Sequence, residues 1–411
     1  MTDTSQHSPL GGSGAARWMR CPGSVALSYG VEDEESEYAT AGLQAHALAE
    51  WCLRSGRDAW ELVRDDSVVD REMADAVQVY LNAACASCPS RTLKGDKWAA
   101  QWGKTKLFAE FAHGSEGLSW VELEFHCPTI HEYCWGKADF TYWSKLKREL
   151  HVWDYKHGAG IVVEVERNPQ LMYYGCGVLE SLDLWNEVDK VMLHIAQPRG
   201  FHYDGPIRSW AVSTHDLWTW KDDVLVPAMD RALASRETAS GEHCRFCPAR
   251  SRACPQVLED FDEMEALMSA MKLDEKDSAG ELTNAQAGRL LDLYDVAKIA
   301  AKAAGKTVFA RLEAGKKVPG RKLARARANR KWKDEAEPAL LKKFGGDAWE
   351  PGKLKSPAKV EEMPEGEKMT ARWAYKPDAG LTVVREDDSR PAVGKDTKAL
   401  FKDQTKKGKK K

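Results

Sequence analysis

Apolar and polar positions over the first 255 residues follow two periods in turn. Residues 41–56 and 168–182 space their apolar side chains as amphipathic helices do; the first segment ends at Gly56 and the second carries Pro169 near its first turn. Other segments alternate apolar and polar side chains or form short apolar runs, as strands do. The predicted strands are residues 120–126, 137–143, 149–156, 190–197 and 207–213.

The order of these segments decides the fold class. The polar turn SKLKR joins 137–143 to 149–156, so we expect an antiparallel pair there. Helix, strand, hairpin, helix and strand then follow one another along the chain. This order predicts an α/β sandwich rather than a helical bundle or a barrel.

Changes in composition divide the chain into five regions. The segment between the core and the helical region is acidic, the second half of the helical region is basic, and the C-terminal end is rich in Pro, Gly and Lys. The predicted regions are 1–15, a disordered lead-in; 16–255, a core that ends in a cysteine cluster; 256–280, an acidic linker; 281–340, a helical and basic region; and 341–411, a loosely structured Lys-rich tail.

Composition also excludes some classes of protein. A net charge of −3 excludes a globally basic nucleic-acid coat, so any phosphate contact must come from local patches. No apolar run is long enough to span a bilayer, and the polar start does not resemble a secretory leader, so we expect a cytoplasmic protein without a membrane partner. Ten cysteines in such a chain argue against a disulfide framework.

One strand pair carries candidate chemistry. Asp154 and Lys156 are two residues apart, so both side chains point to one face of the predicted sheet, and the neighbouring strand offers Asp139. Two carboxylates at one sheet edge repel each other unless a cation neutralises them, and hard oxygen ligands favour Mg²⁺ or Mn²⁺. Lys156 would then orient or activate an attacking water and stabilise charge on a phosphate.

The two predicted helices add further polar pairs. His46 and Glu50 are four residues apart, as are Gln170 and Tyr174, so each pair shares a helix face. A neutral His46 would complete a metal shell, while Gln170 and Tyr174 would orient Lys156 or contact a DNA backbone. Singly, each piece has a simpler interpretation: an Asp-x-Lys on a strand is more often a solvated face, a lone His is usually a core or surface residue, and the other helical pair fits routine packing.

Taken in order, the pieces resemble a known family. The pattern is similar to the RecB-type branch of the PD-(D/E)xK nucleases. It consists of Gly42-x3-His46-x3-Glu50, Gly136-x2-Asp139, Asp154-x-Lys156 and Gln170-x3-Tyr174. The stretches SGAARWMRCPGS, WDYKHGAG, NPQLMYYGCG, IAQPRG and HCRFCPA resemble, more narrowly, a phage and prophage family assigned to that branch. The resemblance covers about residues 13–255 and, more weakly, 319–335.

The resemblance implies a restriction-endonuclease-like core, a central mixed sheet flanked by helices, that hydrolyses DNA phosphodiesters with a metal ion. It implies that His46, Asp139, Asp154 and the backbone carbonyl of Tyr155 are metal ligands and that Lys156 is the catalytic lysine. Many relatives have Glu where this chain has Asp154, and the pattern accepts both. The implied role is an exonuclease in phage DNA replication or recombination, in a bacterial host's cytoplasm, with DNA and phage replication or recombination proteins as partners.

A second candidate site is the cysteine cluster. Cys244, Cys247 and Cys254 give three thiols in a short polar segment, and Cys21 or His243 would supply a fourth ligand. From spacing alone, Zn²⁺ is the default interpretation, and plainly buried cysteines are the alternative. Several RecB-like nucleases, including the AddB subunit and the CRISPR-adaptation nuclease, place one Cys before the core and three after it. That resemblance implies a structural [4Fe-4S] cluster, with Zn²⁺ as the alternative.

Residues 302–333 form a basic segment. They contain twelve Lys or Arg and one acid, Glu313. Such a segment fits a phosphate-contacting DNA surface and, equally, a solvated helix face followed by a loop. Two other functions stay open: a DNA-binding scaffold that keeps the fold without cutting, and an iron–sulfur redox or sensing protein. The sequence marks no oligomeric interface.

Overall fold

The structure is a computed structural model in which two compact units divide the chain at Ile299 and Ala300. It describes residues 8–31, 37–63, 69–88, 110–112, 117–251, 254–270, 283–333, 335–350 and 353–393. The first seven residues of the predicted lead-in (1–7) and the end of the predicted tail (394–411) lie outside the described residues.

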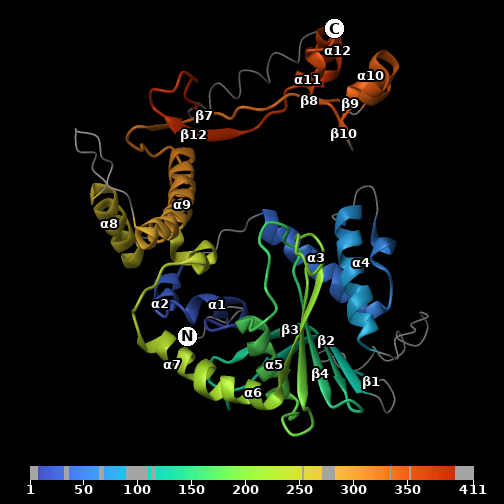
Figure 1. The fold of residues 1–411 in the computed structure, drawn as a ribbon, viewed down its shortest axis with the longest axis vertical. Helices are drawn as coiled ribbons and strands as arrows, with labels where there is room; N and C mark the ends of the chain where they lie inside the picture. The colour runs from blue at the N-terminus through green and yellow to red at the C-terminus, as the bar shows by residue number, and fades with distance from the viewer. Residues whose placement is uncertain are drawn as a thin grey trace, which may run out of the picture. The chain divides into compact units, whose positions relative to one another are not determined.

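The first unit is built on a six-stranded mixed sheet whose strands lie side by side in chain order (Figure 1). Neighbouring strands run antiparallel except the fourth and fifth, which run parallel. The strands are β1 (Glu110–Ala112), β2 (Gly117–His126), β3 (Trp135–Ser144), β4 (Glu149–Tyr155), β5 (Lys190–Ala196) and β6 (Ile207–Ser213). Every strand predicted from the sequence forms, including the β3–β4 hairpin, so the α/β class is confirmed.

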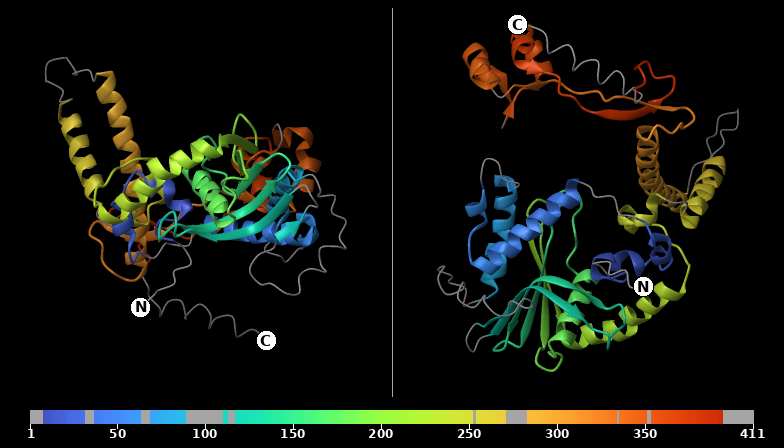
Figure 2. Two further views of the ribbon diagram at one scale, coloured as in Figure 1. Left: turned by 90° about the horizontal axis from the view of Figure 1, so that it is seen from below. Right: turned by 180° about the vertical axis from the view of Figure 1, so that it is seen from behind.

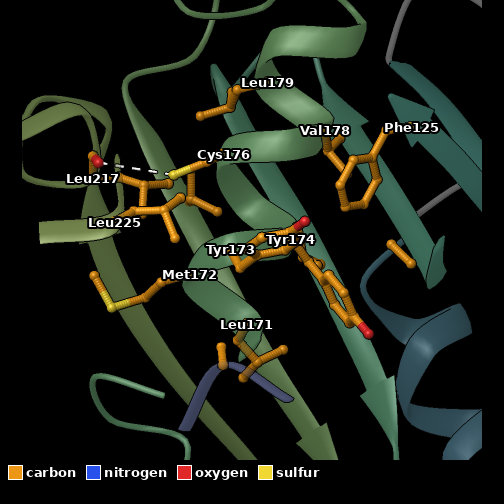
Figure 3. Packing of buried hydrophobic residues seen from close by; sticks show 14 of the residues in the cluster. Phe125, Leu171, Met172, Tyr173, Tyr174, Cys176, Val178, Leu179, Leu217 and Leu225 are labelled. Carbon is orange, nitrogen blue, oxygen red and sulfur yellow. Dashed lines mark hydrogen bonds between the residues drawn. The ribbon is translucent and has the colours of Figure 1, made fainter. Parts of the chain in front are cut away.

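Helix α5 (Pro169–Ser181) makes the crossover between the parallel strands β4 and β5. Its N-terminus is well defined because the Asn168 side chain accepts hydrogen bonds from the first free N–H groups of the helix, and Pro169 needs none. Nine of its residues are buried. They pack with Phe125 and with strands β4 and β5 in the larger core cluster (Figure 3).

The opposite face of the sheet is covered by α3 (Glu37–Ser55) and α4 (Arg71–Ala86), as the two ribbon views agree (Figures 1 and 2). α3 contains the first predicted helix. α4, which the sequence interpretation did not single out, begins at Asp70, whose carboxylate caps Met73 N at 2.7 Å. Tyr80 of α4 is fully buried and stacks on Tyr155 of β4.

The N-terminal segment differs from the predicted disordered lead-in. Within its described part, Leu10 is fully buried and Gly12 lies against the rings of Tyr173 and Tyr174, where a Cβ would meet both. Trp18 follows, also fully buried, and its indole N–H donates to the Gly11 carbonyl at 3.1 Å. Leu10, Gly12 and Ala15 are therefore buried in the core, with Gly12 packed against α5, which the polar composition of the segment did not reveal.

The remaining elements of the first unit are helical. The predicted acidic linker (256–280) begins with a regular helix, α8, rather than an irregular connection. These elements are η1 (Gly12–Gly14), α1 (Ala15–Trp18), α2 (Ser24–Ser28), η2 (Ala59–Leu62), α6 (Thr214–Trp220), η4 (Lys221–Leu225), α7 (Val226–Ala234), η5 (Glu242–Phe246), η6 (Pro248–Ser251), α8 (Pro255–Ala270) and the first half of α9 (Asn284–Glu313).

The second unit contains an antiparallel pair of strands with basic residues and a small core. β7 (Arg321–Arg325) pairs with β12 (Leu381–Arg385). The small core is formed by Ala336, Leu340, Ala348 and Val360, with several tryptophans packed around it. Residues 341–393 thus have more regular structure than the sequence predicted, because elements of two to nine residues are too short to show a period. The short elements of the second unit, two of which begin before residue 341, are β8 (Lys331–Trp332), α10 (Ala336–Phe344), η7 (Gly345–Ala348), β9 (Trp349–Glu350), β10 (Lys353–Leu354), α11 (Pro357–Glu361), α12 (Gly366–Trp373) and β11 (Ala374–Tyr375).

A further expectation concerns membrane-spanning segments. Among the helices of the described residues, none is long and apolar enough to cross a bilayer.

The close approach of α5 to β2 gives a stability prediction. A Cβ at Gly177 would overlap the Phe125 ring, whereas a Cβ at Gly288 of α9 would meet nothing within 4 Å. Alanine favours a helix over glycine by about 1 kcal/mol, but overpacking costs about 1–3 kcal/mol. We expect Gly177→Ala to lower the free energy of unfolding by about 1–2 kcal/mol and Gly288→Ala to raise it slightly, as measured by chemical denaturation. Equal effects of the two changes would contradict this packing.

Candidate active site

The side-chain alternation of two strands breaks at one point of the sheet. In β2, Trp120 and Leu123 bury into the α5-side core although they are three residues apart, and Val121 buries on the other face. In β3, Ala138 and Phe140 are two residues apart yet bury on opposite faces. Both strands therefore change face between these positions, at Glu122 and Asp139.

The backbone explains the break. Glu122 has φ +53°, a left-handed conformation that a non-glycine residue adopts rarely and at a cost of about 1–3 kcal/mol. The β2–β3 ladder omits the Glu122–Asp139 pair, and the β3–β4 ladder ends at Phe140 and Trp153. Asp139 is thus the first residue beyond the point where β3 and β4 separate, and its side chain enters the opening.

Three potential metal ligands meet in this opening. One ligand atom from each of His46, Glu122 and Asp139 lies within 4.8 Å of the other two, the one such group of three found in the described part of the chain. His46 Nδ1 on α3 is 3.6 Å from Asp139 Oδ2, which also accepts the Tyr155 N–H at 2.8 Å. The Glu50 carboxylate is turned away, to Arg54 Nε at 2.8 Å.

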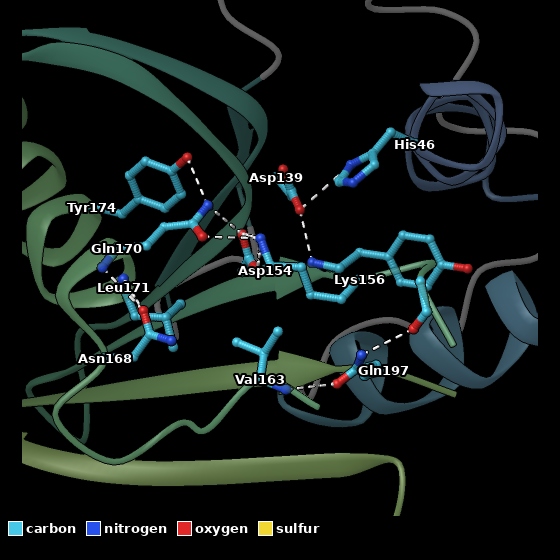
Figure 4. A network of polar contacts seen from close by, with 12 residues as sticks. His46, Asp139, Asp154, Lys156, Val163, Asn168, Gln170, Leu171, Tyr174 and Gln197 are labelled. Atoms are coloured by element: carbon cyan, nitrogen blue, oxygen red, sulfur yellow. Dashed lines mark hydrogen bonds and ion pairs between the residues drawn. The ribbon is translucent and has the colours of Figure 1, made fainter. Parts of the chain in front are cut away.

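A second polar group lies beside the first and joins β4 to α5 (Figure 4). Lys156 Nζ contacts Asp154 Oδ1 at 3.1 Å and donates to Gln170 Oε1 at 2.9 Å. The Gln170 amide donates to Asp154 Oδ1 and to the Tyr174 hydroxyl, each at 3.0 Å. The structure therefore brings together all six side chains that the sequence singled out as catalytic. The Tyr155 main chain reaches the site through its N–H, while its ring lies near His46.

Like charges and burial dominate the electrostatics. Burial and the neighbouring Asp139 raise the pKa of Glu122 to about 7, although Lys137 Nζ lies 2.6 Å from the Glu122 carboxylate. Burial also raises the pKa of Asp154. Asp154 Oδ2 lies 2.9 Å from Lys156 Nζ, yet it is buried and no contact around it has hydrogen-bond geometry.

These residues fit a hard divalent cation. Two carboxylates and an imidazole converge, and a third carboxylate close by keeps one oxygen without a hydrogen bond. Carboxylate-rich sites of this kind suit Mg²⁺ or Mn²⁺. Glu122 was missed in the sequence because it occupies one charged position in an alternating strand. The available signal was the position of Glu122 opposite Asp139 on the neighbouring strand. The direction of the Glu122 side chain, however, depends on its left-handed backbone conformation.

The four candidate cysteines occupy two segments at the ends of the first unit's core. Gly23 N donates to the Glu237 carbonyl at 2.7 Å, and Ala239 N donates to Cys21 Sγ at 3.4 Å, so the segment after α1 is joined to the one before Cys244. Burial raises the pKa of Cys21 and raises that of Cys244 to about 11, and the neighbouring thiols of the set add to both shifts.

Among the described residues, no three of these thiols come within 4.8 Å of one another. The rival ligand His243 uses Nε2 in a 2.9 Å contact with the Ala239 carbonyl, and its Nδ1 is buried without a hydrogen bond.

The basic segment (302–333) contains strand β7, which pairs with β12. Arg321 stands directly opposite Arg385 in its antiparallel register, and both side chains are exposed. Like charges directly opposite each other destabilise a strand pair. Nearby, the guanidinium of Arg390 is paired with the Asp388 carboxylate, to which its Nε donates at 2.8 Å.

Sequence comparison places the chain in a family. Residues 7–98 and 107–391 match the family described as "Protein of unknown function (DUF2800)". The chain belongs to this family. The match includes all residues of the site and both cysteine segments, so the DUF2800 family pattern covers the whole arrangement described above.

The crowding of carboxylates gives two linked expectations for Glu122→Gln. Removing one charge relieves repulsion in the metal-free protein, so the free energy of unfolding in EDTA should rise by about 1–2 kcal/mol. Removing a ligand should weaken Mn²⁺ binding about tenfold or more, as measured by calorimetry. Glu124→Gln, an exposed neighbour on the same strand, is the control and should change neither. A loss of stability together with unchanged Mn²⁺ affinity would show that Glu122 is a structural residue.

Proposed function

We propose that the chain is a divalent-metal-dependent deoxyribonuclease of the PD-(D/E)xK, RecB-like type. One observation carries the proposal: six residues selected from sequence order alone meet in a single site. They come from α3, β3, β4 and α5, elements that are distant in the chain (Figure 4). Solvated faces and routine helix packing give no reason for such a meeting.

The proposed metal ligands are His46, Asp139 and Asp154, with Glu122 added from the geometry. The backbone carbonyl of Tyr155 stays part of the proposal as a further ligand. A bound Mg²⁺ or Mn²⁺ would supply an acidified water and positive charge near the phosphate. A scaffold without catalysis has no physical need for buried carboxylates held this close, because their repulsion destabilises the fold.

Lys156 is the proposed catalytic lysine. Its ammonium group is fixed by the Asp154 carboxylate and the Gln170 amide oxygen, and Gln170 is in turn bonded to Tyr174. A lysine held in this way can orient an attacking water and stabilise the charge that develops on the phosphate. Gln170 and Tyr174 act as positioning residues, because their contacts define where the ammonium group lies.

The proposed substrate is DNA, and the basic strand pair β7–β12 supports it. The net charge is −3, so phosphate binding needs a local patch. Arg321 and Arg385 stand opposite each other in the strand register and are both exposed, so they supply such a patch, and an anionic ligand would lower the repulsion between their charges. The resemblance to RecB-like nucleases favours an exonuclease that acts in phage DNA replication or recombination.

The proposed second cofactor is a structural [4Fe-4S] cluster held by Cys21, Cys244, Cys247 and Cys254. With Zn–S bonds near 2.3 Å, four tetrahedral thiolates lie about 3.8 Å apart, which is closer than any three thiols of this set lie. A larger group suits the wider spacing, and all-thiolate ligation suits iron–sulfur. The cluster would join the segment after α1 to the segment before α8.

The activity is tested with end-labelled linear duplex and single-stranded DNA in Mg²⁺, Mn²⁺ or EDTA. We expect metal-dependent release of label that falls about 10³-fold or more in Asp154→Asn and Lys156→Ala. Glu149→Gln and Lys190→Ala are matched controls, because this ion pair (2.6 Å) lies at the other end of the parallel strands β4 and β5. DNA binding without cleavage by the wild type would favour the scaffold function, and equal cleavage by all variants would indicate a contaminating nuclease.

The cofactor is tested on protein purified without oxygen. We expect iron and acid-labile sulfide in equal amounts, with visible absorbance that Cys21→Ser abolishes and His243→Gln retains. The Cys21→Ser protein should also unfold at a lower temperature, because the two segments lose their link. Stoichiometric zinc without iron would overturn the cluster. Nuclease activity that changes with cluster oxidation state would favour a redox-sensing protein.

A further inference from the structure

Two loops leave the sheet beside the proposed active site. The first follows Lys156 and spans residues 157–163; the second follows β5 and spans residues 198–206. They start next to each other, because β4 and β5 run parallel and Lys156 N donates to the Ala196 carbonyl at 2.8 Å. We call these two loops the twin-loop platform.

A buried clamp joins the two loops. The Gln197 amide donates to the Gly158 and Ile161 carbonyls at 2.9 and 2.7 Å, and its oxygen accepts from Val163 N at 3.0 Å (Figure 4). The Arg208 guanidinium, buried behind it, donates to the carbonyls of Val163 and Gly205. The first loop is thus fixed by Gln197, and Arg208 connects it to the second.

The platform presents apolar side chains to solvent. Phe201 is 91% exposed and Tyr203 is 86% exposed on the second loop. Ile161 and Val162 on the first loop are also partly exposed, at 36% and 37%. Exposing two large aromatic rings to water costs free energy that burying them would recover. Their exposure on one short loop therefore indicates a ligand that binds there.

The Tyr203 ring is held in place. It stacks on the His202 ring with centroids 4.4 Å apart, and the His202 side chain is itself only 4% exposed. His202 Nδ1 accepts a hydrogen bond from Asp204 N at 2.9 Å, and Gly205 N donates to the His202 carbonyl. A ring fixed with one face open is suited to stacking, because little conformational freedom remains to be lost.

The charges around the platform indicate which part of a DNA strand faces it. Asp204, Glu164 and Glu166 lie near Tyr203, and Asp204 contributes most to the raised pKa of its hydroxyl. Arg199, the cationic side chain of this loop, forms an ion pair with Glu72, with 2.8 Å between its guanidinium nitrogen and the carboxylate oxygen. Carboxylates repel phosphates and accept hydrogen bonds from base amino groups. A strand at the platform would therefore turn its bases, not its backbone, toward the rings.

We propose that the twin-loop platform binds unpaired nucleobases by stacking them on Phe201 and Tyr203, which makes a single-stranded or frayed DNA end the substrate at this site. The inference rests on the proposed nuclease function and adds the strand form that it accepts. Phe201 is five residues beyond Ala196 and so at most about 17 Å from it. That span covers about five nucleotides of one strand in B-form geometry.

The test measures binding of the full chain in EDTA by fluorescence anisotropy. Three labelled probes are used: oligo-dT, an abasic strand of the same length with the same phosphates, and a blunt duplex. We expect the wild type to bind oligo-dT at least about tenfold more tightly than the abasic strand. Phe201→Ala combined with Tyr203→Ala should remove this difference and leave abasic binding unchanged. Phe201→Trp with Tyr203→Trp should restore it, and Tyr29→Ala, a change at another exposed aromatic, should have no effect.

The outcomes separate the platform from the nuclease. Base-dependent binding lost in the alanine variant supports the platform even if the wild type cuts nothing. Wild-type cleavage with equal binding of oligo-dT and the abasic strand overturns the platform and leaves the nuclease standing. Unchanged oligo-dT binding by the alanine variant overturns it as well, and makes the loops a protein-binding surface. A wild type that neither binds nor cuts any probe overturns both proposals.

Discussion

The crowding of carboxylates where β3 and β4 separate is the constraint on which the first unit depends. Glu122 and Asp139 face each other across two strands that change face at these residues. Holding them there needs a left-handed residue in mid-strand, a histidine from α3 and a lysine partner on β3. The sheet alone does not supply that support, so helices on both faces are required.

The helical layers on the two faces of the sheet accordingly supply different parts of the site. The α3–α4 side supplies His46 and packs Tyr80 behind Tyr155, which fixes the backbone that donates to Asp139. The α5 side supplies Gln170, which holds Lys156. Because the strands between them are continuous, a change in either helical layer moves part of the site relative to the rest.

Sequence periodicity was sufficient for β2 to β6 and for α5, because each depends on local spacing, and the order of short motifs along the chain selected the other site residues. It was not sufficient for Glu122, whose direction follows from one backbone angle rather than from a pattern. Nor could it find Gln197, whose three bonds go to loop atoms with no period. The short elements of the second unit were not predicted for another reason. They pack around tryptophans and are too short to show a helical or strand repeat.

The packing of Leu10 and Gly12 has a consequence for the order of assembly. Leu10 and Gly12 are synthesised before Tyr173 and Tyr174, whose rings contact Gly12, and Cys21 is synthesised before Ala239, whose N–H donates to its sulfur. Domains fold as units while the chain emerges from the ribosome. Leu10, Gly12 and Cys21 therefore cannot form their native contacts until these later segments have been synthesised. The core closes around the site only after both have been made.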